Sequence, residues 1–176
     1  MANTVMLNDI DELWLLLRER LAGSQYADTY DAEPALEMEV WKRVITLAKD
    51  LGIDVSNACL TSHAIHADRS ADAWQSFCKE RGGPDVNVLG SNNRLDIVLR
   101  HPELGSIGIE VKCLGANGHA GKLTQGLGQA LLGLANRDRT MLVVHCGTVD
   151  VNERQRLRQV GDRICSGLRT CLVVVP

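Results

Sequence analysis

The order of apolar segments in the second half of the chain sets the tightest limit on the fold. Three short strand candidates, "DVNVLG", "RLDIVL" and "IGIEVKCL", are separated by the turn sequences "SNN" and "HPELGS". A predicted helix, "KLTQGLGQALLGLANRD", follows them. After it come a strand at "TMLVVHCG", an amphipathic helix at "DVNERQRLRQVGDRICSGL" and a last strand at "TCLVVVP". Strands interleaved with helices in this way predict an α/β domain, with a central sheet flanked by helices.

Two amphipathic helices are predicted ahead of this region. Residues 9–22 carry an apolar stripe that ends at Gly23, and residues 34–51 begin with a proline and are followed by Gly52. Between these helices and the strands, residues 53–70 read as a strand or irregular loop, and residues 70–83 read as a short helix.

Length and composition favour one compact domain in a reducing compartment. The chain has 176 residues, of which we assign 1–30 to an N-terminal helical extension and 31–176 to the main domain. Six cysteines are scattered without a CxxC pair, and no apolar run reaches the roughly 20 residues that span a bilayer. We therefore expect a cytoplasmic protein with no membrane partner.

Charge is spread unevenly along the sequence. Residues 1–60 carry 5 basic and 11 acidic side chains, a net charge of −6, whereas residues 61–176 carry 14 basic and 11 acidic side chains, a net charge of +3. A polyanion could therefore dock on the C-terminal two-thirds of the chain without meeting the acidic end.

The prediction of function rests on charged residues inside the predicted hairpin. Asp96 and Glu110 each lie within an apolar run, and Lys112 follows Glu110 by two positions. Because side chains two apart in a strand share a face, Glu110 and Lys112 point the same way, and strand pairing can place Asp96 beside Glu110. Neighbouring carboxylates repel unless a cation joins them, and such a pair suits Mg²⁺, with Mn²⁺ as a substitute. The lysine can then orient or deprotonate a water that attacks a phosphodiester.

This arrangement resembles the core of the PD-(D/E)XK nuclease superfamily, which has the restriction-endonuclease-like fold. Asp96 matches its first acid, and Glu110-Val111-Lys112 matches its E-x-K, within a likeness that covers about residues 33–146. The resemblance implies an αβββαβ core, in which helices flank a central mixed β-sheet, with a C-terminal αβ addition and an extra N-terminal helix. It also implies that the main-chain carbonyl of Val111 binds metal. The literal Pro84-Asp85 is an alternative first acid, but "LDIVL" pairs more directly with "IGIEVK".

The same resemblance suggests supporting residues on two helices. An acid on the helix before the sheet often helps to hold metal; Glu37 suits this place, whereas Glu33 and Glu39 are less well phased. Gln125 and Gln129, four apart on the later helix, match glutamines of the family, although many members have Tyr at the second position. The leucine stripe of that helix points away from them, so whether they face the active site stays open.

Candidate contacts to a nucleic-acid backbone are Lys122, His119 and Arg94. The loop "GANGHAGKLT" does not fit the P-loop pattern, and a plain solvated loop is the alternative reading. The arginines of the last helix read as a solvated face, with phosphate contact as the alternative. His63 and His66 have no evident third metal ligand nearby.

These observations lead to one expected function and its alternatives. We expect a Mg²⁺-dependent endonuclease that hydrolyses double-stranded DNA, as a homodimer or as a subunit of a larger defence, repair or mobile-element system. One alternative is a nucleic-acid-binding or assembly module that keeps the fold without cleavage. Another is a nuclease directed at Holliday junctions or RNA.

Overall fold

A computed structural model describes residues 7–54, 59–61, 86–88, 91–115 and 119–176. The predicted helix at 70–83, His63, His66 and Asp85 lie outside these residues. The described helices are α1 (Ile10–Ala22), α2 (Glu33–Asp50), α5 (His119–Gly133) and α6 (Val151–Cys165). The described strands are β1 (Cys59–Thr61), β2 (Val86–Val88), β3 (Ser91–Asn93), β4 (Ile97–His101), β5 (Gly105–Cys113), β6 (Arg139–His145) and β7 (Thr170–Val175).

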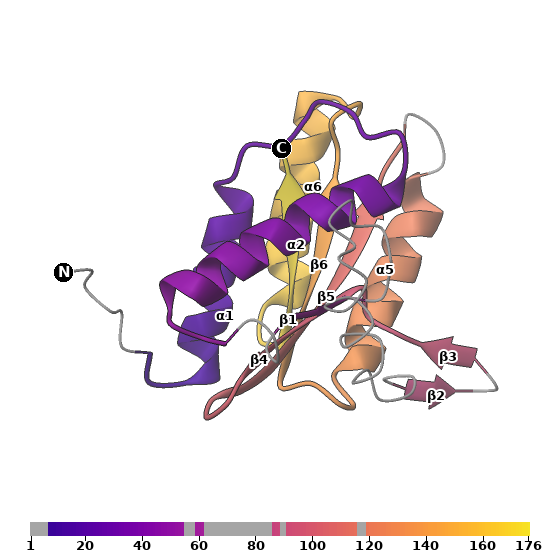
Figure 1. The fold of residues 1–176 in the computed structure, drawn as a ribbon. Coiled ribbons are helices and arrows are strands. Elements are labelled where there is room, and N and C mark those ends of the chain that lie inside the picture. Colours follow the sequence, from indigo (N-terminus) through magenta and orange to yellow (C-terminus); the bar gives the residue numbers. More distant parts are fainter. Residues whose placement is uncertain (1–6, 55–58, 62–85, 89–90, 116–118) are drawn as a thin grey trace.

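A five-stranded mixed sheet in the order β1-β4-β5-β6-β7 forms the centre of the fold. β4 is antiparallel to both β1 and β5, whereas β5, β6 and β7 are parallel to one another. α1 and α2 lie across one face of the sheet, and α5 and α6 lie on the other (Figure 1). The prediction of an α/β domain with a mixed sheet between helices is confirmed at this level.

Each face of the sheet has its own apolar core because strand side chains alternate. In β5, Ile107, Ile109 and Val111 belong to the core under α1 and α2. Leu142 of β6 and Leu172 of β7 belong to the core under α5 and α6. Because the parallel strands are covered on both sides, β6 and β7 are almost continuously apolar, as their sequences suggested.

The region before β4 differs from the prediction. The segment "SNN", expected to be a turn, forms β3, which pairs with β2 in register Val88 to Ser91. These two strands make a separate small sheet that projects beside α5 (Figure 1). The strand expected at "DVNVLG" is therefore absent from the main sheet, where β1 takes the place next to β4. Pairing between neighbouring strands outweighs the weak strand propensity of Ser and Asn here.

Glycines let α5 approach the sheet closely. A side chain at Gly126 would collide with Leu142 and Lys112, and one at Gly133 would collide with Leu95. Gly128, in contrast, faces open space. The buried face of α5 is therefore the narrow one formed by Gly126, Ala130 and Gly133. The helix begins at His119, three residues before the predicted start.

Arg158 of α6 contacts the outer edge of β7, the last strand of the main sheet. Nη2 of Arg158 donates to the main-chain oxygens of Val174, at 3.4 Å, and Pro176, at 2.6 Å. The main-chain oxygen of Val175, which points the other way, accepts from the N–H of Cys146.

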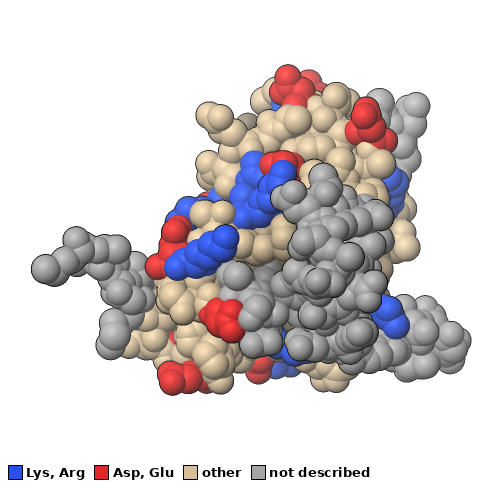
Figure 2. Space-filling view, in the orientation of Figure 1, with Lys and Arg blue, Asp and Glu red and all other residues tan. Residues whose placement is uncertain are grey.

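Surface charge on the α2 side of the molecule is mixed in sign. Lys and Arg side chains lie next to Asp and Glu on this face (Figure 2). Glu39, for example, pairs with Arg43 at 2.8 Å and with Lys42 at 3.4 Å. Within the described part of the chain, no helix combines the length and apolar character that crossing a bilayer requires.

Candidate active site

The candidate site lies just ahead of the first residue of β4, opposite the second half of β5. The last paired residues are Ile97 of β4 and Ile109 of β5, so Asp96 falls opposite Glu110 in the same register. Oδ2 of Asp96 accepts the main-chain N–H of Val111 at 2.8 Å. The carboxylate thus takes over the hydrogen bond that a longer β4 would have made, and it is held against β5.

Asp96 itself lies in a bend immediately before β4, not inside the strand as predicted. The bend sends Leu95 toward Gly108 and Gly133 on the α5 side, whereas Ile97 belongs to the core on the opposite side. Leu95 and Ile97 therefore point to opposite faces, because the strand alternation does not extend through the bend.

Glu110 is fully buried, with 0% of its surface exposed. Its Oε1 accepts from Nζ of Lys112 at 2.6 Å, whereas Oε2 has no hydrogen-bond partner among the described residues. Burial, and secondarily the charge of Asp96, raise the pKa of Glu110 to about 8, although Lys112 acts in the opposite direction. One buried oxygen of this carboxyl group is therefore left available to a ligand.

Lys112 is a buried cation that three oxygens surround. Its Nζ donates to Oε1 of Glu110 at 2.6 Å, to Oε1 of Glu33 at 3.1 Å and to the main-chain oxygen of Val111 at 3.1 Å. Burial alone would lower the pKa of Lys112, but Glu110, Asp96 and Glu33 together raise it above its ordinary value. The amine therefore stays protonated near neutral pH and suits orienting water or stabilising negative charge better than removing a proton.

Glu33 joins the cluster although helix phasing had favoured Glu37. It is the first residue of α2, and its Oε2 accepts the main-chain N–H of Cys113 at 3.3 Å. A side chain at the first helical position can reach beyond the helix end, so its place on the helical face does not decide what it contacts. Glu37 is also buried, one turn further along α2, whereas Glu39 is occupied by its ion pairs with Lys42 and Arg43.

The donor set fits a small hard cation that keeps part of its water. Among the described residues, no three His, Cys, Asp or Glu side chains form a group that could hold a metal ion. Asp96, Glu110 and the Val111 carbonyl are the oxygens at hand, and Mg²⁺ commonly binds through one or two carboxylates plus water and phosphate. The unpartnered Oε2 of Glu110, and the gathering of three carboxyl groups around one amine, are the observations that make a divalent cation suitable.

The two predicted glutamines occupy different environments on α5. Gln125 is exposed, whereas Gln129 is half-buried and its Oε1 has no partner among the described residues. The main-chain oxygen of Gln129 accepts from Nδ2 of Asn93 at 3.0 Å, which ties α5 to β3. α5 does cover the sheet face that carries Lys112, since Gly126 lies directly over that side chain.

The predicted nucleic-acid contacts lie near the end of β5. Nζ of Lys122 donates to the main-chain oxygen of Cys113 at 3.0 Å, one residue beyond Lys112. Arg94 is exposed just ahead of Asp96. His119, at the start of α5, lines a cavity of about 440 Å³ whose apolar walls include Leu114 and Leu157.

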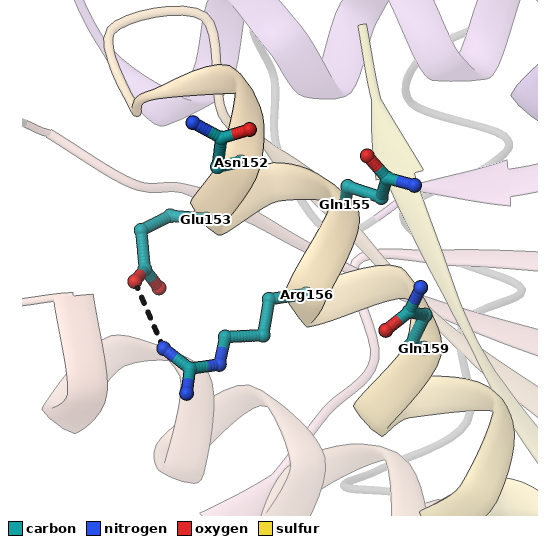
Figure 3. Close-up of a pocket in the computed structure, with 5 residues that line it drawn as sticks. All are labelled: Asn152, Glu153, Gln155, Arg156 and Gln159. Atoms are coloured by element: carbon teal, nitrogen blue, oxygen red, sulfur yellow. Dashed lines mark hydrogen bonds and ion pairs between the residues drawn. The ribbon is translucent and has the colours of Figure 1, made fainter.

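The α6 arginines do not contribute to this cluster. Arg156 pairs with Glu153 at 3.4 Å beside a shallow hollow of about 290 Å³ that α6 residues line (Figure 3). Arg156 and Glu153 are both exposed, which fits the solvated-face reading of this helix.

Comparisons with known proteins found no match among protein-family models, curated proteins or solved structures.

Proposed function

We propose that the chain is a metal-dependent nuclease with a restriction-endonuclease-like core. The observation that carries the proposal is the meeting of Asp96, Glu110 and Lys112 beside the start of β4, in the register that brings the two acids together. Burying two carboxyl groups beside each other is unfavourable unless positive charge offsets them, and Lys112 supplies only one such charge, which supports a second cation at this place.

Each residue has a role that its position supports. Asp96, Glu110 and the carbonyl of Val111 would hold Mg²⁺ or Mn²⁺, which supplies a polarised phosphate and an acidified water when bound. The protonated amine of Lys112 orients the water that forms the new P–O bond, and it stabilises charge on the phosphate while the ester P–O bond breaks. Glu37, a buried acid one turn beyond Glu33 on α2, would support the site from that helix.

We further propose DNA, in double-stranded form, as the substrate. Lys122, Arg94 and His119 lie around the end of β5 and the start of β4, where they can contact phosphates that flank the scissile bond. A homodimer, or a place in a larger complex, would let two such sites act on two strands. A cytoplasmic setting is part of the same proposal.

Incubation with plasmid, single-stranded DNA, branched DNA and RNA tests the proposal. Cutting is expected with Mg²⁺ or Mn²⁺ and not with EDTA. Lys112→Ala is expected to lower kcat about 10²- to 10⁴-fold because it removes the charged group beside the phosphate. Lys42→Ala, which removes an exposed lysine of α2, is the matched control.

The pattern of substrates separates the alternatives. Preferential cutting of branched DNA or RNA would support a nuclease that uses the same reaction on Holliday junctions or RNA. Binding of nucleic acid without cutting under any metal condition would contradict the enzyme and support a non-cleaving module. Cutting that survives both EDTA and Lys112→Ala would come from another site or another protein.

A further inference from the structure

The ammonium of Lys112 lies where a metal cation would also be stabilised. It is 2.6 Å from Oε1 of Glu110 and 3.1 Å from the carbonyl of Val111, two of the oxygens proposed as metal ligands. A divalent ion held by the unpartnered Oε2 of Glu110 and by the Val111 carbonyl would meet a positive charge that already contacts the same two groups. Repulsion between the two cations therefore favours movement of the amine.

We propose that Lys112 and the divalent cation compete for Glu110, and that Glu33 is the positioning residue that receives the lysine when the cation binds. This inference rests on the proposed function only in placing a divalent ion at Glu110. It assigns Glu33 a role through Lys112, separate from any direct contact with metal.

The geometry of Glu33 supports this role. Its Oε2 is anchored by the N–H of Cys113 at 3.3 Å, which leaves Oε1 directed at Lys112, 3.1 Å from Nζ. With Glu110 and Asp96 engaged by the divalent ion, a displaced ammonium would otherwise be left buried without a free counter-charge, which is strongly unfavourable. Glu33 supplies that counter-charge without a large movement of the chain.

The packing of α5 limits how the lysine can move. Gly126 lies so close to Cγ of Lys112 that a side chain there would collide with it. The aliphatic part of Lys112 is therefore confined between the sheet and α5, and the terminal amine is the part that can shift. Such a shift toward Glu33 frees Glu110 and the Val111 carbonyl together.

Mn²⁺ affinity measured without nucleic acid tests the competition. The full chain is titrated with MnCl₂, and free Mn²⁺ is followed by its electron paramagnetic resonance signal. Lys112→Met is expected to tighten Mn²⁺ binding about tenfold or more, because the cation no longer displaces a charged hydrogen bond. Lys42→Met removes the same charge from an exposed position of α2 and is expected to change the affinity less than about twofold. Circular dichroism melting shows that the variants fold.

A double-mutant cycle with Glu33→Gln tests the receiving role. In the wild-type background this change is expected to weaken Mn²⁺ binding about three- to tenfold, because the lysine then stays on Glu110. In the Lys112→Met background it is expected to have little effect.

Each result has one interpretation. Equal weakening by Glu33→Gln in both backgrounds would make Glu33 a direct ligand and overturn its proposed role. Unchanged affinity in Lys112→Met, or no Mn²⁺ binding by either protein, would overturn the competition. Mn²⁺ binding that obeys the cycle in a protein that cuts no nucleic acid would sustain the competition while refuting the nuclease.

Discussion

Replacing Glu110 by glutamine is expected to remove a large part of the pH dependence of stability between about pH 5 and 8. The pKa of this carboxyl group is about 8 in the folded chain, mainly because of burial, against an ordinary value of 4.5. Between these two values the folded protein keeps the proton and the unfolded chain loses it. The free energy of unfolding therefore falls as the pH rises.

The size of the effect follows from the shift. The stabilising contribution of Glu110 is fully present below about pH 4.5 and is lost as the pH rises through about 8. Each pKa unit corresponds to about 1.4 kcal/mol, so the contribution falls by about 4 kcal/mol from pH 5 to pH 8. His145, whose pKa is lowered mainly by burial, gives a slope of opposite sign in this window, but wild type and variant share it.

Urea unfolding of both proteins in EDTA, at half-unit steps from pH 5 to 8, gives the difference in free energy of unfolding. Glu19→Gln alters the same type of side chain on an exposed part of α1 and is the matched control. A difference between wild type and Glu110→Gln that stays flat within about 1 kcal/mol would refute the reasoning, because it would show that Glu110 titrates alike in both states.

Two further predictions concern packing and metal. Gly126→Ala is expected to destabilise the protein by about 1–3 kcal/mol and to lower nuclease activity by displacing Lys112. Gly128 faces open space, so Gly128→Ala is expected to stabilise α5 by up to about 1 kcal/mol. Urea unfolding and a cutting assay check both variants, and equal effects of the two changes would contradict the prediction. Mg²⁺ at about 100 times its Kd is expected to add about 3 kcal/mol to the free energy of unfolding. The gain is expected to be smaller at pH 6 than at pH 8.5, because protonated Glu110 binds cations poorly. Thermal melts at both pH values check this, and a larger gain at pH 6 would count against Glu110 as a ligand.

The alternation of strands and helices after residue 94 could be predicted because each segment has a single dominant period. β6 and β7 are buried on both faces, so their sequences are continuously apolar, and α6 between them is plainly amphipathic. The hairpin of β4 and β5 could be found for the same reason, and the register in the structure sets Asp96 opposite Glu110, a pairing that the strand pattern permitted.

Other features depend on contacts that the local pattern does not contain. The period-two pattern runs unbroken through Leu95 and Asp96, yet the chain bends there because Leu95 fills the space above Gly108 and Gly133. β3 has no strand-forming residues and owes its conformation to pairing with β2. Helical phasing did not predict the role of Glu33, because this residue is the first of α2 and its side chain reaches β5 beyond the helix end.

Arg158 affects the edge of the main sheet that β7 forms. An edge strand as apolar as β7 offers main-chain oxygens to any extended segment that approaches it, which is a route to aggregation. The guanidinium group occupies the oxygens of Val174 and Pro176 and adds a positive charge there. With these two oxygens already hydrogen-bonded, that part of the β7 edge is less able to pair with a strand of a neighbouring copy.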